Sequence, residues 1–238
     1  MRKINLLAGL VMLLITLSGC LYPQDRLSQN QVPYKDQIQM VQNAVNQFQE
    51  NEGGILPIKT KDSDTPIYQK YLIDFNKLSP RYISEPPGSA FESGGIFQYV
   101  LVDVESDPKV KLIDLTSVEV IRELKLRINF YREKHSYPPY KEKIAENYFT
   151  VDYEELGYGD SPPYVKSPYS QKNLPLFIDT QGEIYIDYAA DLYAELQKNK
   201  TNYQPGDDIR GILVSEYDFV PAYSVPYTIK DNEPIFLQ

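Results

Sequence analysis

Tryptophan is absent from this sequence of 238 residues, and cysteine and histidine each occur only once. A single cysteine, Cys20, cannot form a disulfide bond within the chain, so packing has to provide the stability of the fold. Structural zinc sites use several Cys or His ligands, which this composition does not supply. The one histidine, His135, lies at the end of a predicted amphipathic helix, where a positive charge gains from the helix dipole. No motif supplies a nucleophile and an orienting acid beside it, and we interpret His135 as structural or solvent-exposed.

Positive charge is also scarce, since 24 Lys and Arg stand against 33 Asp and Glu and give a net charge of −9. Binding to nucleic acid needs a basic surface that releases counterions, so we expect no nucleic-acid partner. The same balance argues against an electrostatic hold on anionic lipid. Tyrosine, by contrast, is abundant with 21 residues. Its rigid apolar ring with a polar tip suits half-buried strands and exposed contact surfaces.

The first residues have the layout of an export signal. Arg2 and Lys3 precede an apolar stretch from Ile4 to Leu17, and small residues follow it. This stretch would form a helix of roughly 21 Å. That is too short for a hydrocarbon core of about 30 Å, so a permanent transmembrane helix fits poorly. We predict that residues 1–19 are a signal peptide.

The last three residues of the predicted signal peptide and the cysteine after them add a second indication. Leu17, Ser18, Gly19 and Cys20 resemble the lipobox of bacterial lipoproteins, which is an apolar residue, two small residues and a cysteine. The resemblance implies a diacylglyceryl group on the Cys20 sulfur, cleavage before Cys20 and a lipidated new N-terminus. As a thioether this sulfur has no redox or metal-binding role, and acyl chains contribute about 0.8 kcal/mol per buried methylene to anchoring. The alternatives are an ordinary signal peptide with an incidental cysteine, or an uncleaved anchor.

A longer stretch of the chain supports the same compartment. From the lipobox through "QNQVPYKDQIQMVQNAVNQFQ" and "GGILPIKTKDSDTPIYQKY", the sequence is similar to uncharacterised lipoproteins of Bacillus-type Gram-positive bacteria. The similarity implies a location at the outer face of the cytoplasmic membrane, facing the wall. It implies no activity.

After the predicted anchor, residues 20–36 are polar, contain two prolines and read as a tether. Two amphipathic helices are then predicted, each with apolar residues at steps of three, four and three. Their stripes are Ile38, Val41, Val45 and Phe48 in the first helix and Ile121, Leu124, Ile128 and Tyr131 in the second. We therefore predict an α+β fold of two related units, residues 37–116 and 117–238, each a helix followed by a small antiparallel sheet.

Further matches keep the same order in both predicted units. An elbow with proline, a short aromatic segment, a proline pair and a β-hairpin with an acidic turn follow each helix. The matched pairs are Leu56-Pro57 and Tyr137-Pro138, residues 71–78 and 148–156, Pro86-Pro87 and Pro162-Pro163, and residues 99–115 and 174–188. The alternative is that an α+β chain yields such matches by chance. In the C-terminal extension, we predict a short helix over 189–200 and short strands from 204 to 238, which either complete the second unit or pair with the first.

The helix and elbow pattern also resembles the soluble part of type II secretion pseudopilins. The matching residues are Phe48 with Leu56-Pro57, and Tyr131 with Tyr137-Pro138. This resemblance implies a helix that packs on a three- or four-stranded sheet, and it concerns the fold alone. The chain departs from that family in having a lipobox and in showing the pattern twice.

Residues of the types that carry catalysis lack the partners that catalysis needs. Ser89 and Ser93 lie in "PPGSAFESGG", which has no nucleophile elbow and which we interpret as a flexible loop. The acidic turns "DVESD" and "DTQGE" lack calcium-loop spacing, and no phosphate-binding or dinucleotide-binding motif occurs. We predict no catalytic residue, no metal and no cofactor.

Paired carboxylates are the strongest enzymatic alternative, because a glycosidase that acts on the wall needs two of them. The pairs that can be nominated are Glu154 with Glu155 and Asp103 with Asp187. Among 33 acidic residues such pairs are expected by chance, so we interpret them as solvated surface.

Two segments rich in tyrosine and proline, "SYPPYKE" and "SPPYVKSPYS", provide the best candidate contact surface. Their tyrosines are Tyr137, Tyr140, Tyr164 and Tyr169. Prolines order such loops in advance, so that tyrosines bind at a low cost in entropy. The alternative is that the segments are rigid elbows that cap the sheet edges.

The sequence therefore favours a lipid-anchored, extracytoplasmic, non-enzymatic protein that binds or scaffolds an envelope partner. The first alternative is the solute-binding receptor of an ABC importer, although the chain lacks the alternating strands and helices of two parallel-sheet lobes. A cell-wall hydrolase is the less favoured third possibility.

Overall fold

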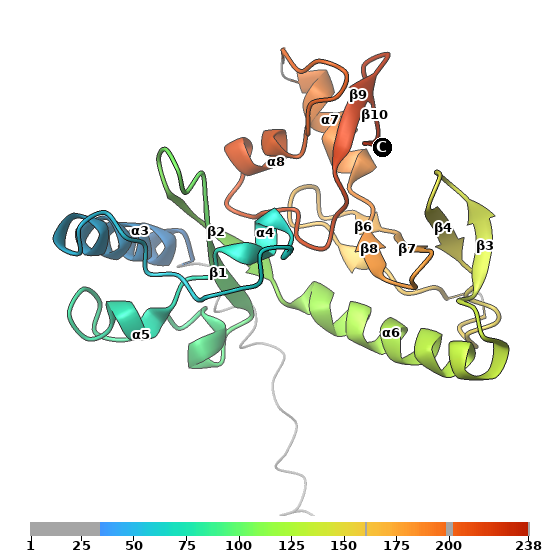
Figure 1. Cartoon of the computed structure of the whole chain (residues 1–238), viewed down its shortest axis with the longest axis horizontal. Helices are drawn as coiled ribbons and strands as arrows, with labels where there is room; N and C mark the ends of the chain where they lie inside the picture. The colour runs from blue at the N-terminus through green and yellow to red at the C-terminus, as the bar shows by residue number, and fades with distance from the viewer. Residues whose placement is uncertain (1–33, 160, 199–201, 238) are drawn as a thin grey trace, which may run out of the picture. The chain divides into compact units, whose positions relative to one another are not determined.

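The structure is a computed structural model of the chain, and it describes residues 34–159, 161–198 and 202–237 (Figure 1). The predicted signal peptide, the lipobox with Cys20 and most of the predicted tether lie outside the described residues. The fold class is α+β, as predicted, with helices and small antiparallel sheets. Within the described ranges, no helix combines the length and apolar character that a membrane span requires.

The N-terminal part consists of a long helix, short helical turns and a hairpin. These elements are α3 (Tyr34–Asn51), α4 (Ile67–Lys70), α5 (Phe75–Leu78), a 3₁₀ turn (Phe91–Ser93), β1 (Phe97–Val102) and β2 (Lys109–Asp114). The predicted stripe of α3 is confirmed, because Val41, Val45 and Phe48 are buried. The helix begins at Tyr34, so the last three residues that were predicted as tether belong to it. The predicted tether is thus too long at its C-terminal end.

The side chain of Gln42 attaches α3 to the hairpin. Its Nε2 donates to the Pro108 carbonyl at 2.9 Å, and its Oε1 accepts from the Val110 amide at 2.7 Å. On the far side of the hairpin, Leu72 forms an antiparallel bridge to Val100 of β1. Strand β1 therefore has a partner on each side, with the whole of β2 along one edge and the bridge from Leu72 at the other.

The next part begins with α6 (Thr116–His135), which packs beside a four-stranded antiparallel sheet. The strands are β3 (Tyr140–Lys143), β4 (Tyr148–Val151), β7 (Leu176–Asp179) and β8 (Ile184–Ile186), in the order β3-β4-β7-β8. A small pair, β5 (Val165–Lys166) and β6 (Asn173–Leu174), lies between β4 and β7 in the chain. Leu124 and Ile128 of α6 are fully buried, in one cluster with Phe177 and Ile178 of β7. Both predicted hairpins are confirmed, whereas the predicted duplication stays a prediction.

The C-terminal part corrects one expectation. Its elements are α7 (Ala189–Lys198), α8 (Gly211–Glu216), β9 (Tyr227–Lys230) and β10 (Glu233–Phe236). Strands alone were predicted after residue 204, but α8 is a helix. A short apolar run is compatible with either state. Ile212, Leu213 and Val214 are all buried here. Three consecutive helical residues point in different directions, so their burial requires that neighbouring elements pack around the helix.

The segment 217–225 contacts two strands at sheet edges, β2 of the β1–β2 hairpin and β8 of the four-stranded sheet. The Leu112 amide of β2 donates to the Asp218 carbonyl at 2.9 Å, and the Val220 amide donates back to Leu112 at 3.0 Å. The Ile186 amide of β8 donates to the Tyr223 carbonyl at 2.8 Å. The predicted tail strands, β9 and β10, pair with each other, and it is the irregular segment before them that hydrogen-bonds to β2 and to β8.

Tyrosines fill much of the interior, and their burial has a consequence at high pH. Tyr188 and Tyr227 are almost fully buried, and the Tyr227 hydroxyl donates to Asp187 at 2.8 Å. Burial raises the pKa of both phenols far above the usual 10.0. Burial is also the main cause that raises the pKa of Tyr68 to about 12. The neutral phenol is thus favoured in the folded state.

We therefore expect the protein to unfold in alkali. Below pH 10 these tyrosines are neutral in both states, and above it they ionise first in the unfolded chain, so the free energy of unfolding falls. The unfolding midpoint is expected between about pH 10 and pH 12. Tyrosinate absorbance and far-UV circular dichroism, followed during the same titration, should change together. Gradual tyrosine ionisation with an unchanged dichroism signal would contradict the expectation.

Candidate ligand-binding pocket

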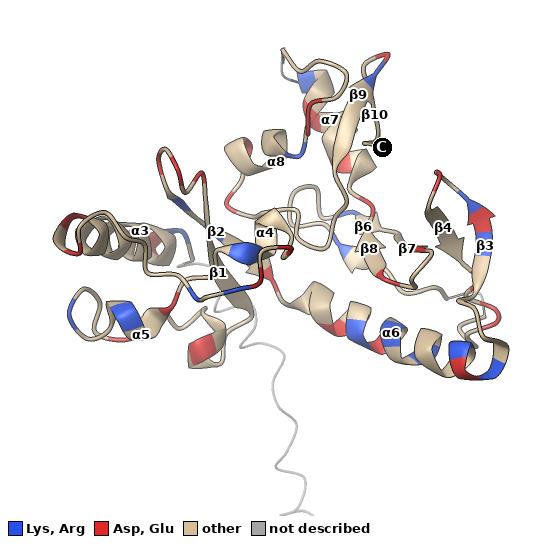
Figure 2. Ribbon diagram, in the orientation of Figure 1, with Lys and Arg blue, Asp and Glu red and all other residues tan. Residues whose placement is uncertain are grey.

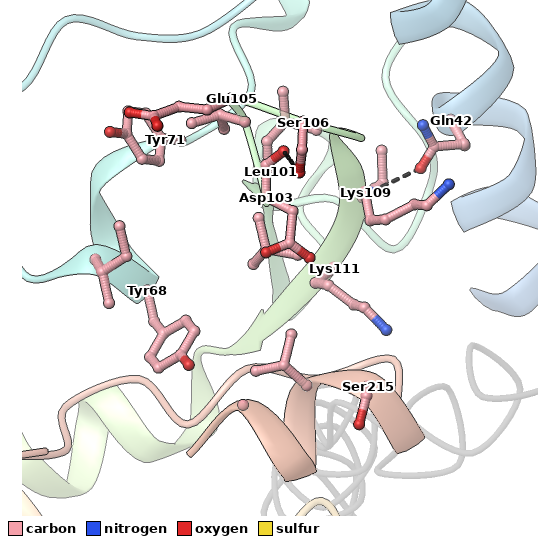
Figure 3. Close-up of a pocket in the computed structure, with 16 residues that line it drawn as sticks. Gln42, Tyr68, Tyr71, Leu101, Asp103, Glu105, Ser106, Lys109, Lys111 and Ser215 are labelled. Carbon is pink, nitrogen blue, oxygen red and sulfur yellow. Dashed lines mark hydrogen bonds between the residues drawn. The ribbon is translucent and has the colours of Figure 1, made fainter. Parts of the chain in front are cut away.

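A pocket of about 690 Å³ lies where α3, α4, the β1–β2 hairpin and α8 approach one another (Figure 3). Sites for small ligands commonly have volumes of about 300–1,000 Å³. Its floor is apolar, because Leu101 of β1, Val110 of β2 and Val214 of α8 are buried there. Ile67 stands at the rim with 50% of its surface exposed. The charged residues that line the pocket all lie on the β1–β2 hairpin, two acidic ones in its turn and two lysines in β2 (Figure 2).

Two aromatic residues, Tyr68 and Tyr71, form one wall. Tyr68 lies in α4 and Tyr71 is the residue that caps its C-terminus, and both line the pocket beside the hairpin. The Leu101 amide of β1 donates to the Tyr71 carbonyl at 2.9 Å, which holds α4 against the sheet. The Tyr68 hydroxyl makes no hydrogen bond to any residue in the described ranges.

The buried guanidinium of Arg210, which is paired with the exposed Asp208, packs over the Tyr68 ring. The Arg210 guanidinium lies 5.0 Å from the ring centre. Its Nη2 donates to Asp208 at 2.6 Å and its Nη1 to the Ser224 carbonyl at 3.0 Å. This positive charge lowers the pKa of Tyr68, but burial raises it more. Tyr68 therefore acts as a neutral hydrogen-bonding group at physiological pH.

Both lysines of the pocket are already engaged. The Lys111 ammonium donates to the Tyr217 carbonyl at 2.6 Å, and Lys109 forms an ion pair with Asp107 at 2.7 Å. Burial lowers the pKa of Lys111, and the negative charges of Asp218 and Asp103 oppose that shift. Neither lysine is thus an unengaged cation within the pocket.

Asp103 and Glu105 follow β1 at the turn of the hairpin and line the pocket, with Asp103 exposed. Asp103 has a φ of 52°, in the left-handed region. Aspartate and asparagine tolerate this region better than most residues. The turn is closed by main-chain bonds from Ser106 and Asp107 to the Asp103 carbonyl, each 3.1 Å. These contacts use the backbone of Asp103 and leave its carboxylate to solvent.

The four tyrosines that were predicted as a contact surface do not line this pocket. Tyr137 and Tyr164 are each 52% exposed, as a contact surface requires. Tyr140 is half-buried and its hydroxyl donates to the Thr180 carbonyl at 2.9 Å. The Tyr169 hydroxyl is buried, because its ring packs against those of Tyr188 and Tyr217. Tyr169 is therefore only partly exposed, with its polar tip inside the protein, and the contact surface stays a prediction.

The expectation for the serine loop also needs a correction. Ser89 is buried rather than in a flexible loop, because its hydroxyl shares a 2.8 Å hydrogen bond with the Tyr99 hydroxyl. Ser93 lies in the 3₁₀ turn and donates to the Pro86 carbonyl at 2.9 Å. His135 is exposed at the end of α6, as predicted, with its ring stacked on that of Tyr131.

The nominated carboxylate pairs do not form a joint site. Asp103 lines the pocket described above, whereas Asp187 lines another pocket of about 620 Å³ beside the β9–β10 hairpin. Glu154 and Glu155 are exposed in a turn after β4. In the ranges that the structure describes, no group of three or more His, Cys, Asp or Glu is placed to hold a metal ion.

Most of the residues that line the pocket belong to a segment that matches a known domain family. Residues 34–114 match the model of the YphF family N-terminal domain. Neither the curated proteins nor the solved structures contain a significant match to the chain. Of the 16 residues that line the pocket, 13 lie within the matched range. The remaining three, from α8, come from the C-terminal part.

Sequence reasoning found only one part of this pocket. Asp103 was singled out, but in a pair with Asp187, and Tyr68, Tyr71 and Lys111 were not considered. The spacing of Tyr68 and Tyr71 is the one local signal that points to a shared face. The rest was not accessible, because the walls come from four segments that are far apart in the chain.

Proposed function

We propose that the protein is a lipid-anchored, non-enzymatic binding protein at the outer face of the cytoplasmic membrane of a Gram-positive bacterium. In this proposal, Cys20 carries the lipid and the pocket beside the β1–β2 hairpin receives the ligand or a segment of an envelope partner. The single observation that carries the binding role is the pocket, which combines an apolar floor, two tyrosine rings and two unengaged carboxylates.

The hydrogen bonds inside the pocket support binding rather than catalysis. A nucleophile is activated by a base within hydrogen-bonding reach. In this pocket, the two serine hydroxyls and the Lys111 ammonium, which are the candidate nucleophiles, each donate to a backbone carbonyl and not to a base. The Ser215 hydroxyl donates to Ile212 at 3.0 Å, the Ser106 hydroxyl to Asp103 at 3.5 Å and the Lys111 ammonium to Tyr217 at 2.6 Å.

A second candidate is the solute-binding receptor of an importer, because the pocket has the volume of a small-molecule site. The two candidates differ in what occupies the pocket. A receptor binds a free solute of a few hundred daltons, whereas a scaffold protein binds part of another polypeptide.

Site-specific crosslinking in living cells tests both candidates. The photoreactive residue benzoylphenylalanine would replace Ile67, which is 50% exposed at the pocket rim. A matched control would carry it at Tyr193, which is 46% exposed on α7 and outside the pocket. We expect a discrete adduct only from position 67, identified by mass spectrometry.

The mass of the adduct separates the outcomes of this crosslinking. A protein-sized adduct with one identified envelope protein supports the scaffold role, and an addition of a few hundred daltons supports the receptor. Equal labelling from both positions, or no adduct from position 67, would count against binding in this pocket.

A further inference from the structure

The lysines that line the pocket have hydrogen-bond or ion-pair partners in the protein, whereas the carboxylates that line it have none. Among the described residues, neither the Asp103 nor the Glu105 carboxylate makes a hydrogen bond or an ion pair. The two lysines that line the same pocket are engaged, Lys109 with Asp107 and Lys111 with a backbone carbonyl. Figure 3 shows Asp103 in the middle of the pocket, with the Lys111 ammonium pointing away from Tyr68. The pocket thus offers two negative charges to a ligand.

The third nearby cation, Arg210, does not change this balance. Asp208 binds its guanidinium at 2.6 Å, and only 6% of the Arg210 side chain is exposed. The ion pair has no net charge, the guanidinium packs over the Tyr68 ring, and neither Arg210 nor Asp208 lines the pocket. The positive charge of Lys111 interacts electrostatically with Asp103, but the hydrogen bond of its ammonium goes to the Tyr217 carbonyl.

The uncharged surfaces of the pocket suit the stem of a cationic ligand. An alkyl chain could lie on the apolar floor of Leu101 and Val214 while its charged end reaches the carboxylates. Tyrosine faces attract ammonium and guanidinium groups, with typical contributions of about 0.5–1 kcal/mol at exposed sites. Figure 3 places Tyr71 and Glu105 on the same side of the pocket. The net charge of −9 on the whole chain favours the approach of a cation further.

We infer that the pocket binds a ligand with a primary ammonium or guanidinium group on an apolar stem. Such a group belongs either to a lysine or arginine side chain of an envelope polypeptide or to a free alkylamine. This inference rests on the proposed function, because it names the chemistry of the ligand in the same pocket.

Isothermal titration calorimetry with the full-length protein in detergent micelles tests the inference. The probes are the blocked peptide acetyl-GKAKG-amide, the same peptide with norleucine or with glutamate in place of lysine, and 1,5-diaminopentane. We expect the lysine peptide to bind at least about tenfold more tightly than the norleucine peptide, and the glutamate peptide not to bind. The lysine-peptide affinity should fall as salt is added, because exposed charges are screened.

The matched variants remove charge without disturbing the turn. In the double variant Asp103→Asn and Glu105→Gln, the asparagine tolerates the left-handed φ of 52° that Asp103 has. The control is Asp231→Asn, because Asp231 has a φ of 51° in the β9–β10 turn and lies outside the pocket. We expect the double variant to bind the lysine peptide at least about tenfold more weakly, and the control to bind it as the native protein does. Equal melting temperatures would show that all three proteins are folded.

The outcomes separate this inference from the proposed function. Binding of diaminopentane alone assigns the ligand to the free amines, and binding of the lysine peptide alone assigns it to polypeptide side chains. If the norleucine or glutamate peptide binds as tightly as the lysine peptide, or the double variant binds unchanged, the inference is wrong. The crosslink at position 67 then decides separately whether the pocket binds at all. A specific crosslink would preserve the proposed function even if no cationic probe binds, and that combination would overturn only the inference.

Discussion

Replacing Cys20 with alanine is expected to abolish the incorporation of palmitate into the protein and to release it from the membrane fraction. The sulfur of Cys20 is the only thiol in the sequence, so no other residue can form the thioether. Two or more acyl chains make membrane binding stable, whereas one myristoyl chain is only marginal. Loss of the anchor should therefore be nearly complete rather than graded. Labelling of cells with an alkyne analogue of palmitate, followed by fractionation, measures both effects.

The matched control for this experiment is Ser18→Ala. It changes the adjacent lipobox position but keeps a small residue there, and we expect full labelling and membrane attachment. Mass spectrometry of the native N-terminal peptide provides an independent measurement, with an acylated Cys20 as the expected first residue. A free thiol at this position would disprove lipidation.

Replacing Gly95 with alanine is expected to destabilise the N-terminal part strongly. A Cβ at this position would lie 2.1 Å from the carbonyl oxygen of Ser89, which is far inside van der Waals contact. The oxygen belongs to the backbone and is held by the Phe97 amide at 3.0 Å, so it cannot turn away as a side chain would. The backbone must shift, and we expect a loss of at least about 3 kcal/mol in the free energy of unfolding.

Gly88→Ala provides the matched control for this substitution. It lies in the same connection, and a Cβ there meets nothing within 4 Å. We expect its effect to stay within about 0.5 kcal/mol. Urea unfolding of the full-length proteins in detergent, followed by circular dichroism, compares the two variants. Equal midpoints for both variants would contradict the packing described around Ser89.

Local patterns were sufficient for the long helices and the hairpins. In α3 and α6, apolar residues recur with the helical period, and most of the same residues are buried in the structure. The β7–β8 hairpin was predicted with an acidic turn, and the Asp179 side chain there accepts hydrogen bonds from the amides of Gln181 at 2.8 Å and Glu183 at 2.9 Å. These elements depend on neighbours within a few residues, so their sequence contains the information directly.

By itself, then, the sequence determined the α+β class, the two amphipathic helices, the two hairpins and the residues that resemble a lipobox. The tertiary structure decided the helical state of α8, the burial of Ser89 and of the Tyr169 hydroxyl, and the contacts of the segment 217–225 with β2 and β8. It also decided the pocket, where Asp103, Tyr68 and Val214 meet from distant parts of the chain. The physical reason is that helical and hairpin periodicity is local, whereas burial and pocket walls depend on contacts between segments that sequence spacing does not specify.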